Sequence, residues 1–175
     1  MNCETALKID TIISSIFVFI FSMVDVVFLY YLPLTVLSLI YVRSYKEKNT
    51  FNVMDFVTSI VTVISMLIFS LLLTVSSLEI ILAVVVAPCV EEITIRGLFF
   101  DMVDSISKDK RIAVFVSALI FSVWHSIAYP DIVILTMVFI FGIIFGYFRV
   151  RSTLYTCILM HRLFNFFNLV FAFIY

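Results

Sequence analysis

Residues 78–100 read LEIILAVVVAPCVEEITIRGLFF, an apolar run that contains two adjacent glutamates and an arginine. A helix that crosses a bilayer needs about 20 apolar residues at 1.5 Å rise each, and this run is long enough. An ionisable side chain within such a helix costs about 2.5–3.5 kcal/mol on insertion scales. Glu91, Glu92 and Arg96 are therefore expected to face the interior of a helix bundle rather than lipid.

The composition of the whole chain agrees with a membrane-embedded protein. Of its 175 residues, 64% are hydrophobic and 13% are charged, and the mean hydropathy is +1.23. Soluble domains are about 45–50% apolar and about 25% charged. These values exclude a disordered chain and an ordinary soluble enzyme. The net charge of −1 gives no general attraction to nucleic acid, so the expected partner is the lipid bilayer.

The apolar runs predict an all-α, polytopic bundle that forms a single integral-membrane domain over residues 1–175. The predicted spans are 11–42, 54–76, 79–100, 112–129, 132–149 and 153–174. The first run, which contains Asp25 and Pro33, is too long for one untilted span. We interpret it as one long kinked helix or as a span followed by a short re-entrant piece, because two full spans would not fit comfortably. Six spans are expected, with seven as the alternative.

Basic residues alternate between loops in a way that predicts orientation. Loops 43–50, 104–111 and 149–153 carry two or three Lys or Arg each, whereas the turns near 74–79 and 129–131 carry none. By the positive-inside rule, the three basic loops are expected to be cytoplasmic. The protein would then be a multi-pass membrane protein, in the cell membrane if its source is prokaryotic.

The small residues indicate packing roles. Cys3, Cys89 and Cys157 are widely spaced and form no CxxC pair, so we expect them to act as small hydrophobic residues. Gly142 and Gly146 form a GxxxG motif that lets a second helix approach closely. Packing within the chain is favoured over a dimer interface, and the oligomeric state is not determined by the sequence.

The spacing of the three charges assigns them different roles. Glu92 and Arg96 are four residues apart and about 40° apart around an α-helix, which favours an ion pair. Glu91 is turned about 100° from Glu92 and is not neutralised in the same way. A buried carboxylate of this kind is suited to proton transfer. Pro88, one turn earlier, is expected to kink the helix where the carboxylates begin.

The two histidines of the chain both lie within predicted spans. His125 ends the sequence FSVWH, and His161 begins HRLFN, which places Asn165 on the same helix face as His161. Since consecutive spans run in opposite directions, Glu91, His125 and His161 fall within roughly 10 Å of one membrane depth. The sequence therefore predicts one intramembrane pocket containing a carboxylate, two imidazoles and an amide.

These three segments resemble the motifs EExxxR, FxxxH and HxxxN of the CAAX protease and bacteriocin-processing family, also called Abi proteins, which are intramembrane proteases. The resemblance covers approximately residues 80–170 and implies a peptide or membrane-protein substrate. It implies that Glu91 is the general base that activates water, assisted by His125. It also implies that His161 and Asn165 polarise the scissile carbonyl, and that Glu92 and Arg96 form a supporting ion pair.

Two features of the resemblance leave the chemistry open. Proteins of this family are often described as metalloproteases, and one Glu with two His could hold a divalent ion such as Zn²⁺. However, HExxH is absent, and a metal-free glutamate mechanism uses the same residues, so the metal is undetermined. Arg162 departs from the usual small or apolar residue after His161. It is expected to extend toward the interface or to pair with an acid such as Asp101.

Other functions remain compatible with the sequence. A non-catalytic immunity or scaffold protein of the same fold, for example one giving bacteriocin self-immunity, would keep the bundle without the reaction. An ion or proton-coupled transporter is less favoured, because inverted repeats with broken helices in both halves are not found. The sequence does not identify the substrate, the cleaved bond or any dependence on prenylation.

Overall fold

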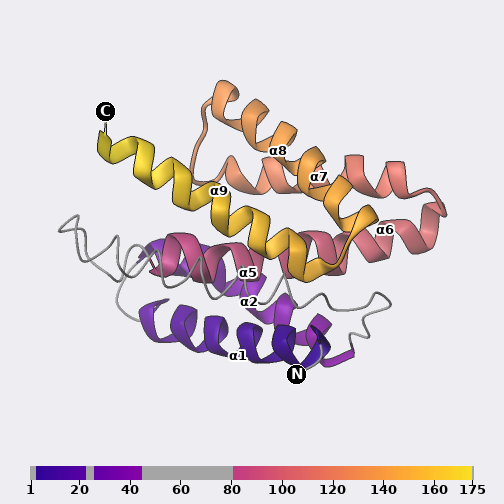
Figure 1. The fold of residues 1–175 in the computed structure, drawn as a ribbon, viewed down its shortest axis with the longest axis horizontal. Helices are drawn as coiled ribbons and strands as arrows, with labels where there is room; N and C mark the ends of the chain where they lie inside the picture. The colour runs from indigo at the N-terminus through magenta and orange to yellow at the C-terminus, as the bar shows by residue number, and fades with distance from the viewer. Residues whose placement is uncertain (1–2, 23–25, 45–80, 175) are drawn as a thin grey trace.

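The computed structural model describes residues 3–22, 26–44 and 81–174. These residues are helical apart from short turns, and the described part contains no strand, so the predicted all-α class is confirmed. The predicted span 54–76, Asp25, Asp55 and most of loop 43–50 lie outside the described residues. Figure 1 shows the helices, which are α1 (Cys3–Ser22), α2 (Val26–Ser44), η1 (Ile81–Val86), α5 (Ala87–Glu92), η2 (Ile93–Phe99), α6 (Phe100–Ser107), α7 (Lys110–His125), α8 (Ile132–Arg151) and α9 (Leu154–Ile174).

The first long apolar run forms two separate helices, not one kinked helix or a span with a re-entrant piece. Helices α1 and α2 contain 20 and 19 residues and pack against each other (Figure 1). The sequence prediction began the first span at residue 11, whereas α1 begins at Cys3. Its charged residues continue the helix because Lys8 pairs with Glu4 one turn away, and Asp10 pairs with a residue of α9.

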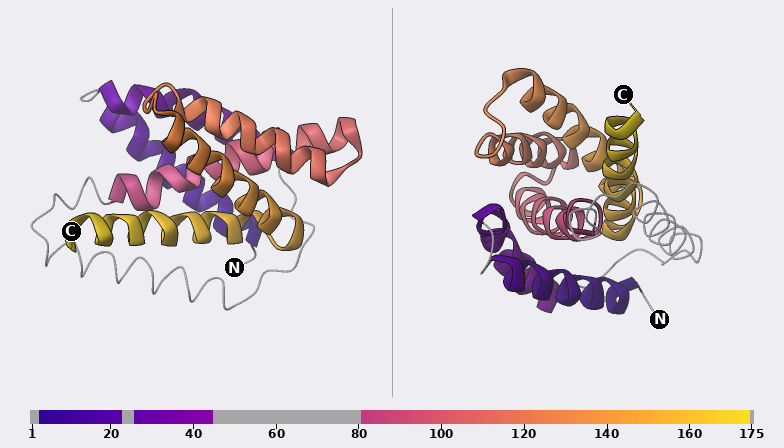
Figure 2. Two further views of the ribbon diagram at one scale, coloured as in Figure 1. Left: turned by 90° about the horizontal axis from the view of Figure 1, so that it is seen from above. Right: turned by 90° about the vertical axis from the view of Figure 1, so that its left-hand side faces the viewer.

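The segment that carries the two glutamates forms the centre of the bundle. Elements η1, α5, η2 and α6 follow one another without a break, and every residue from 86 to 97 is buried. Helices α1 and α2 lie on one side of this segment, and α7, α8 and α9 lie on the other (Figure 2). The expectation that its charges face the bundle interior is confirmed. The flanking turns η1 and η2 are π-helical, a conformation often found at functional sites.

Apolar side chains from distant parts of the chain enclose this central segment. One cluster joins Leu7, Cys89 and Ile158, which belong to α1, α5 and α9. Cys89 and Cys157 are free thiols and are completely buried, as expected of small hydrophobic residues. These contacts fix the positions of α5 and α9 relative to each other, and both helices carry candidate site residues.

Glycines bring α7 and α8 together. A Cβ atom on Gly142 would lie 2.9 Å from Ala118 Cβ, and one on Gly146 would lie 2.9 Å from Val114 Cγ1. The GxxxG motif therefore serves packing within the chain, as predicted. Helix α8 begins at Asp131, whose carboxylate accepts hydrogen bonds from Val133 N and Ile134 N at 2.7 and 3.1 Å. Asp131 is therefore the N-cap of α8.

Two of the described helices are long and apolar enough to cross a membrane, Ile132–Arg151 and Leu154–Phe171. Only 17% of the first is buried within the chain, and its exposed side chains include Ile132, Val133, Met137 and Ile140. A helix that presents so many large apolar groups outward is matched to a lipid environment.

Candidate active site

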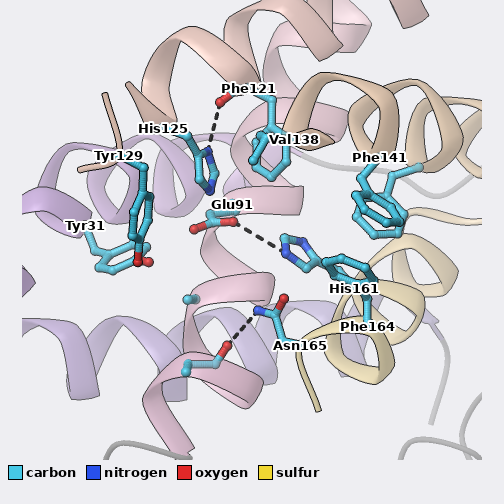
Figure 3. Close-up of a pocket in the computed structure, with 13 residues that line it drawn as sticks. Tyr31, Glu91, Phe121, His125, Tyr129, Val138, Phe141, His161, Phe164 and Asn165 are labelled. Carbon is cyan, nitrogen blue, oxygen red and sulfur yellow. Dashed lines mark hydrogen bonds and ion pairs between the residues drawn. The ribbon is translucent and has the colours of Figure 1, made fainter. Parts of the chain in front are cut away.

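A cavity of about 260 Å³ lies between α5, α7 and α9 and contains four of the predicted site residues. Glu91 comes from α5, His125 from the end of α7, and His161 and Asn165 from α9; all four line the cavity wall (Figure 3). The sequence prediction that these side chains share one pocket agrees with this arrangement. The two remaining predicted residues, Glu92 and Arg96, lie behind the wall and are fully buried.

Glu91 and His161 form the floor of the cavity. His161 Nε2 lies 3.7 Å from Oε2 of Glu91, and the two residues are only 5% and 3% exposed. This separation exceeds a direct hydrogen bond but leaves both groups within reach of one small polar molecule between them. The carboxylate therefore faces a partly enclosed space next to a polar partner.

Glu92 holds the other side of the His161 ring. Its Oε1 lies 2.8 Å from His161 Nδ1 and 3.3 Å from an Arg96 guanidinium nitrogen. The predicted Glu92–Arg96 ion pair is thus confirmed. Because a carboxylate only accepts, Nδ1 carries the proton, which fixes the orientation of the ring.

Arg96 is held in place from several directions. Its Nη2 donates to the Gly142 carbonyl at 3.2 Å, and its guanidinium lies 4.3 Å from the centre of the Phe121 ring. The close approach at Gly142, where the arginine nitrogen lies 3.3 Å from the Cβ position, leaves no room for a larger residue. The glycine motif of α8 therefore also makes space for the buried ion pair.

His125 is oriented by the backbone of its own helix. Its Nδ1 donates to the Phe121 carbonyl at 2.9 Å (Figure 3). Since that carbonyl can only accept, Nδ1 carries a proton, and in the neutral tautomer the lone pair is on Nε2. The spacing FxxxH has a physical basis here, because residue 121 supplies both the acceptor and a ring 4.4 Å away.

Asn165 is anchored to the opposite wall. Its Nδ2 donates to the Ala83 carbonyl of η1 at 2.8 Å. An amide nitrogen carries two hydrogens, so one of them is left for another acceptor. The anchoring to η1 was not predictable from the sequence, because nothing in the HxxxN spacing identifies a partner 82 positions away.

Arg162 pairs with Asp10 and not with Asp101. Its Nη2 donates to both carboxylate oxygens of Asp10, at 2.9 and 2.8 Å, and to the Val85 carbonyl at 2.9 Å. Asp101 is instead bound by Tyr41 and by Arg149, at 2.6 and 3.2 Å. Arg162 thus pairs with an acid, as expected, but the example Asp101 was wrong because Arg162 faces α1 rather than α6.

Breaking the buried Arg162–Asp10 pair is expected to destabilise the bundle. The Arg162→Met variant leaves a largely buried carboxylate without its partner, a change that costs about 3–5 kcal/mol in the free energy of unfolding. The Asp10→Asn/Arg162→Met double variant removes both charges and should recover most of that loss. Unfolding of the detergent-solubilised variants measures both effects. A double variant no more stable than Arg162→Met would contradict the pairing.

Several cavity residues were not anticipated from the motifs. The lining also includes Tyr31, Tyr129, Phe141, Phe145 and Phe164, and Phe145 stacks on His161 with ring centres 5.0 Å apart. Tyr129 follows His125 by four residues, a spacing that could have indicated a shared face. Tyr31 comes from α2, where no motif distinguishes it. The walls of the cavity are therefore mainly aromatic.

The side chains present do not form a metal site. Within the ranges that the structure describes, no three His, Cys, Asp or Glu side chains are grouped so that they could hold one ion. Because no three such donors are grouped, the described side chains do not fit the zinc site considered from the sequence.

Comparison with known families gives one result that covers more than half of the chain. Residues 73–167 match the family model described as type II CAAX prenyl endopeptidase Rce1-like. The matched region contains the EExxxR, FxxxH and HxxxN segments. It therefore includes all of the candidate site residues from Glu91 to Asn165. No curated protein and no solved structure matches the chain significantly.

Proposed function

Since the chain belongs to the Rce1-like family of type II CAAX prenyl endopeptidases, we propose that it hydrolyses a peptide bond within the membrane with water activated by Glu91. One observation carries the proposal: three separate helices contribute side chains to the wall of a single cavity. These side chains are Glu91, His125, His161 and Asn165. Amide hydrolysis needs an activated water, donors for the oxyanion and a proton for the leaving amine. The cavity supplies a group for each requirement.

Glu91 acts as the general base. Water beside the Glu91 carboxylate transfers a proton to Glu91 as its oxygen attacks the carbonyl carbon, while His161 Nε2, 3.7 Å from that carboxylate, faces the carbonyl oxygen. His125 Nε2, with its lone pair free, orients this water by accepting its second hydrogen. Protonated Glu91 then returns the proton to the leaving amine.

His161 and Asn165 stabilise the oxyanion. This role uses an N–H on each ring nitrogen of His161, of which Nδ1 faces the Glu92 carboxylate and Nε2 faces that of Glu91. Glu92 accepts from Nδ1, so Nε2–H and the second amide hydrogen of Asn165 are the donors to the carbonyl oxygen. Donors fixed before the reaction stabilise developing charge without reorganisation.

The aromatic walls suit an apolar substrate segment. Phe121, Phe141, Phe145 and Phe164 surround the polar floor, so a peptide or membrane-protein segment can enter without exposing polar backbone to lipid. The basic α6–α7 and α8–α9 turns also lie together, since Lys110, Arg111 and Arg151 line one cavity. This supports our proposal that both turns are on the cytoplasmic side.

A cleavage assay with purified protein tests the function. The probes are a peptide ending in a farnesylated CAAX sequence and the same peptide without the lipid, and mass spectrometry identifies the products. We expect a new carboxyl terminus and, with hydroxylamine present, no hydroxamate, because water attacks directly. A hydroxamate product would reveal an acyl-enzyme intermediate and contradict the proposed mechanism.

The Asn165→Ala variant is expected to lower kcat by about 10²–10³-fold with a smaller change in KM, because one oxyanion donor is lost. Asn168→Ala is the matched control, since Asn168 is exposed on the same helix and is absent from the cavity wall. Steady-state cleavage kinetics measure both variants. Equal losses in the two would show that the effect belongs to the helix and not to the oxyanion.

A further inference from the structure

A second cavity, of about 430 Å³, lies between the beginning of α7 and the end of α8. Val114, Phe115, Ile143, Tyr147 and Val150 form its apolar part. The close contact between Gly146 and Val114 brings the two helices together here, so both flanks of the cavity are held by a tightly packed helix pair. None of these residues lines the candidate active site.

Three cations line the same cavity. Lys110 and Arg111 open α7, and Arg151 ends α8 with its guanidinium 5.2 Å from the Tyr147 ring centre. Asp109 is the acidic group nearby, and it accepts from Arg111 at 3.1 Å. The hydrogen bonds from Arg111 lower the pKa of Asp109 below its ordinary value, so Asp109 remains charged and offsets one cation. Two positive charges are left at the end of an apolar groove.

The surface around the groove is apolar and exposed. Phe115 and Tyr147 are each 54% exposed, and Ile112 and Ile144 are 46% and 42% exposed. In a membrane-embedded chain these side chains face acyl chains, while Lys and Arg at the helix ends lie at headgroup level. The groove is thus apolar along most of its length and cationic at one end. This arrangement is complementary to an anionic lipid, which has an apolar chain and a negatively charged headgroup.

We propose that this groove binds an anionic glycerophospholipid, with its phosphate at Lys110 and Arg151 and an acyl chain against Phe115 and Tyr147. Basic pockets between transmembrane helices are suited to phosphate headgroups. A zwitterionic lipid would place its own cation among these residues and lose the electrostatic gain. A free phosphate would leave the apolar length of the groove unused.

Native mass spectrometry of the detergent-solubilised protein tests this site with phosphatidylglycerol as the probe. The Lys110→Gln/Arg151→Gln variant removes two exposed cations and is expected to bind phosphatidylglycerol about 30-fold more weakly. Lys108→Gln is the matched control, because Lys108 is exposed in the same turn but does not line the groove. Lys110→Arg/Arg151→Lys keeps both charges and should keep binding.

Other lipids and a soluble anion complete the experiment. Phosphatidylcholine with the same acyl chains is expected to bind wild-type protein at least tenfold more weakly, and glycerol 3-phosphate should not displace the bound lipid. Equal binding of the two lipids, or unchanged binding in the Lys110→Gln/Arg151→Gln variant, would overturn the proposal. So would an equal loss in Lys108→Gln, or displacement by glycerol 3-phosphate, which would indicate an anion site without lipid selectivity.

Discussion

The Glu91→Gln variant is expected to fold normally and to lose cleavage activity by about 10²–10⁴-fold, the range typical of removing a general base. Glutamine has the same shape as glutamate. The Glu91 carboxylate lies 3.7 Å from His161 Nε2, beyond hydrogen-bond distance, whereas the Glu92 carboxylate lies 2.8 Å from His161 Nδ1. Folding should therefore survive while the water loses its proton acceptor. Melting in detergent and single-turnover cleavage measure the two effects separately.

A control variant and a biological readout separate the remaining interpretations. Glu4→Gln removes a carboxylate that pairs with Lys8 in α1, away from the cavity, and should leave cleavage unchanged. Full activity in Glu91→Gln would eliminate the mechanism proposed here. If the protein confers immunity, protection retained by an inactive Glu91→Gln variant would favour the non-catalytic scaffold function.

The site was largely predictable because its residues follow helix periodicity. The four-residue spacings Glu92–Arg96, Phe121–His125 and His161–Asn165 each place two groups on one face, and an intramembrane charge has few alternatives to the bundle interior. The structure retains the Glu92–Arg96 contact although the helix widens into a π-turn from Ile93 onward. The contact predicted from the four-residue spacing is therefore present although the segment is π-helical rather than α-helical.

What the sequence could not provide depends on contacts between distant segments. The pairing of Arg162 with Asp10 spans 152 positions, and Asp10 lies before the first apolar run. Likewise, Tyr31 reaches the cavity only because α2 packs on α5. The division of 11–42 into two helices was missed for a related reason. The cost of the partly buried Asp10 carboxylate is offset by Arg162, a partner that only the fold brings near.

A second large effect is expected for Glu92, for a reason different from that at Glu91. Its Oε1 serves both His161 Nδ1 at 2.8 Å and Arg96 at 3.3 Å, and both Glu92 and Arg96 are 0% exposed. The Glu92→Gln variant leaves the Arg96 charge buried without its counter-ion. We expect it to lose about 3–5 kcal/mol of unfolding free energy, in addition to activity.

The Glu92→Gln/Arg96→Met double variant distinguishes the two roles of Glu92. Removing both charges should recover most of the stability, because a buried ion pair is often replaceable by apolar groups. Activity should stay low, since a neutral amide accepts from Nδ1 but does not stabilise the imidazolium form of His161. Chemical unfolding and cleavage kinetics on the same preparations measure both. If Glu92→Gln is as stable as the wild type, Arg96 does not depend on Glu92. If the double variant regains activity, Glu92 acts only through Arg96, and His161 needs no carboxylate behind it.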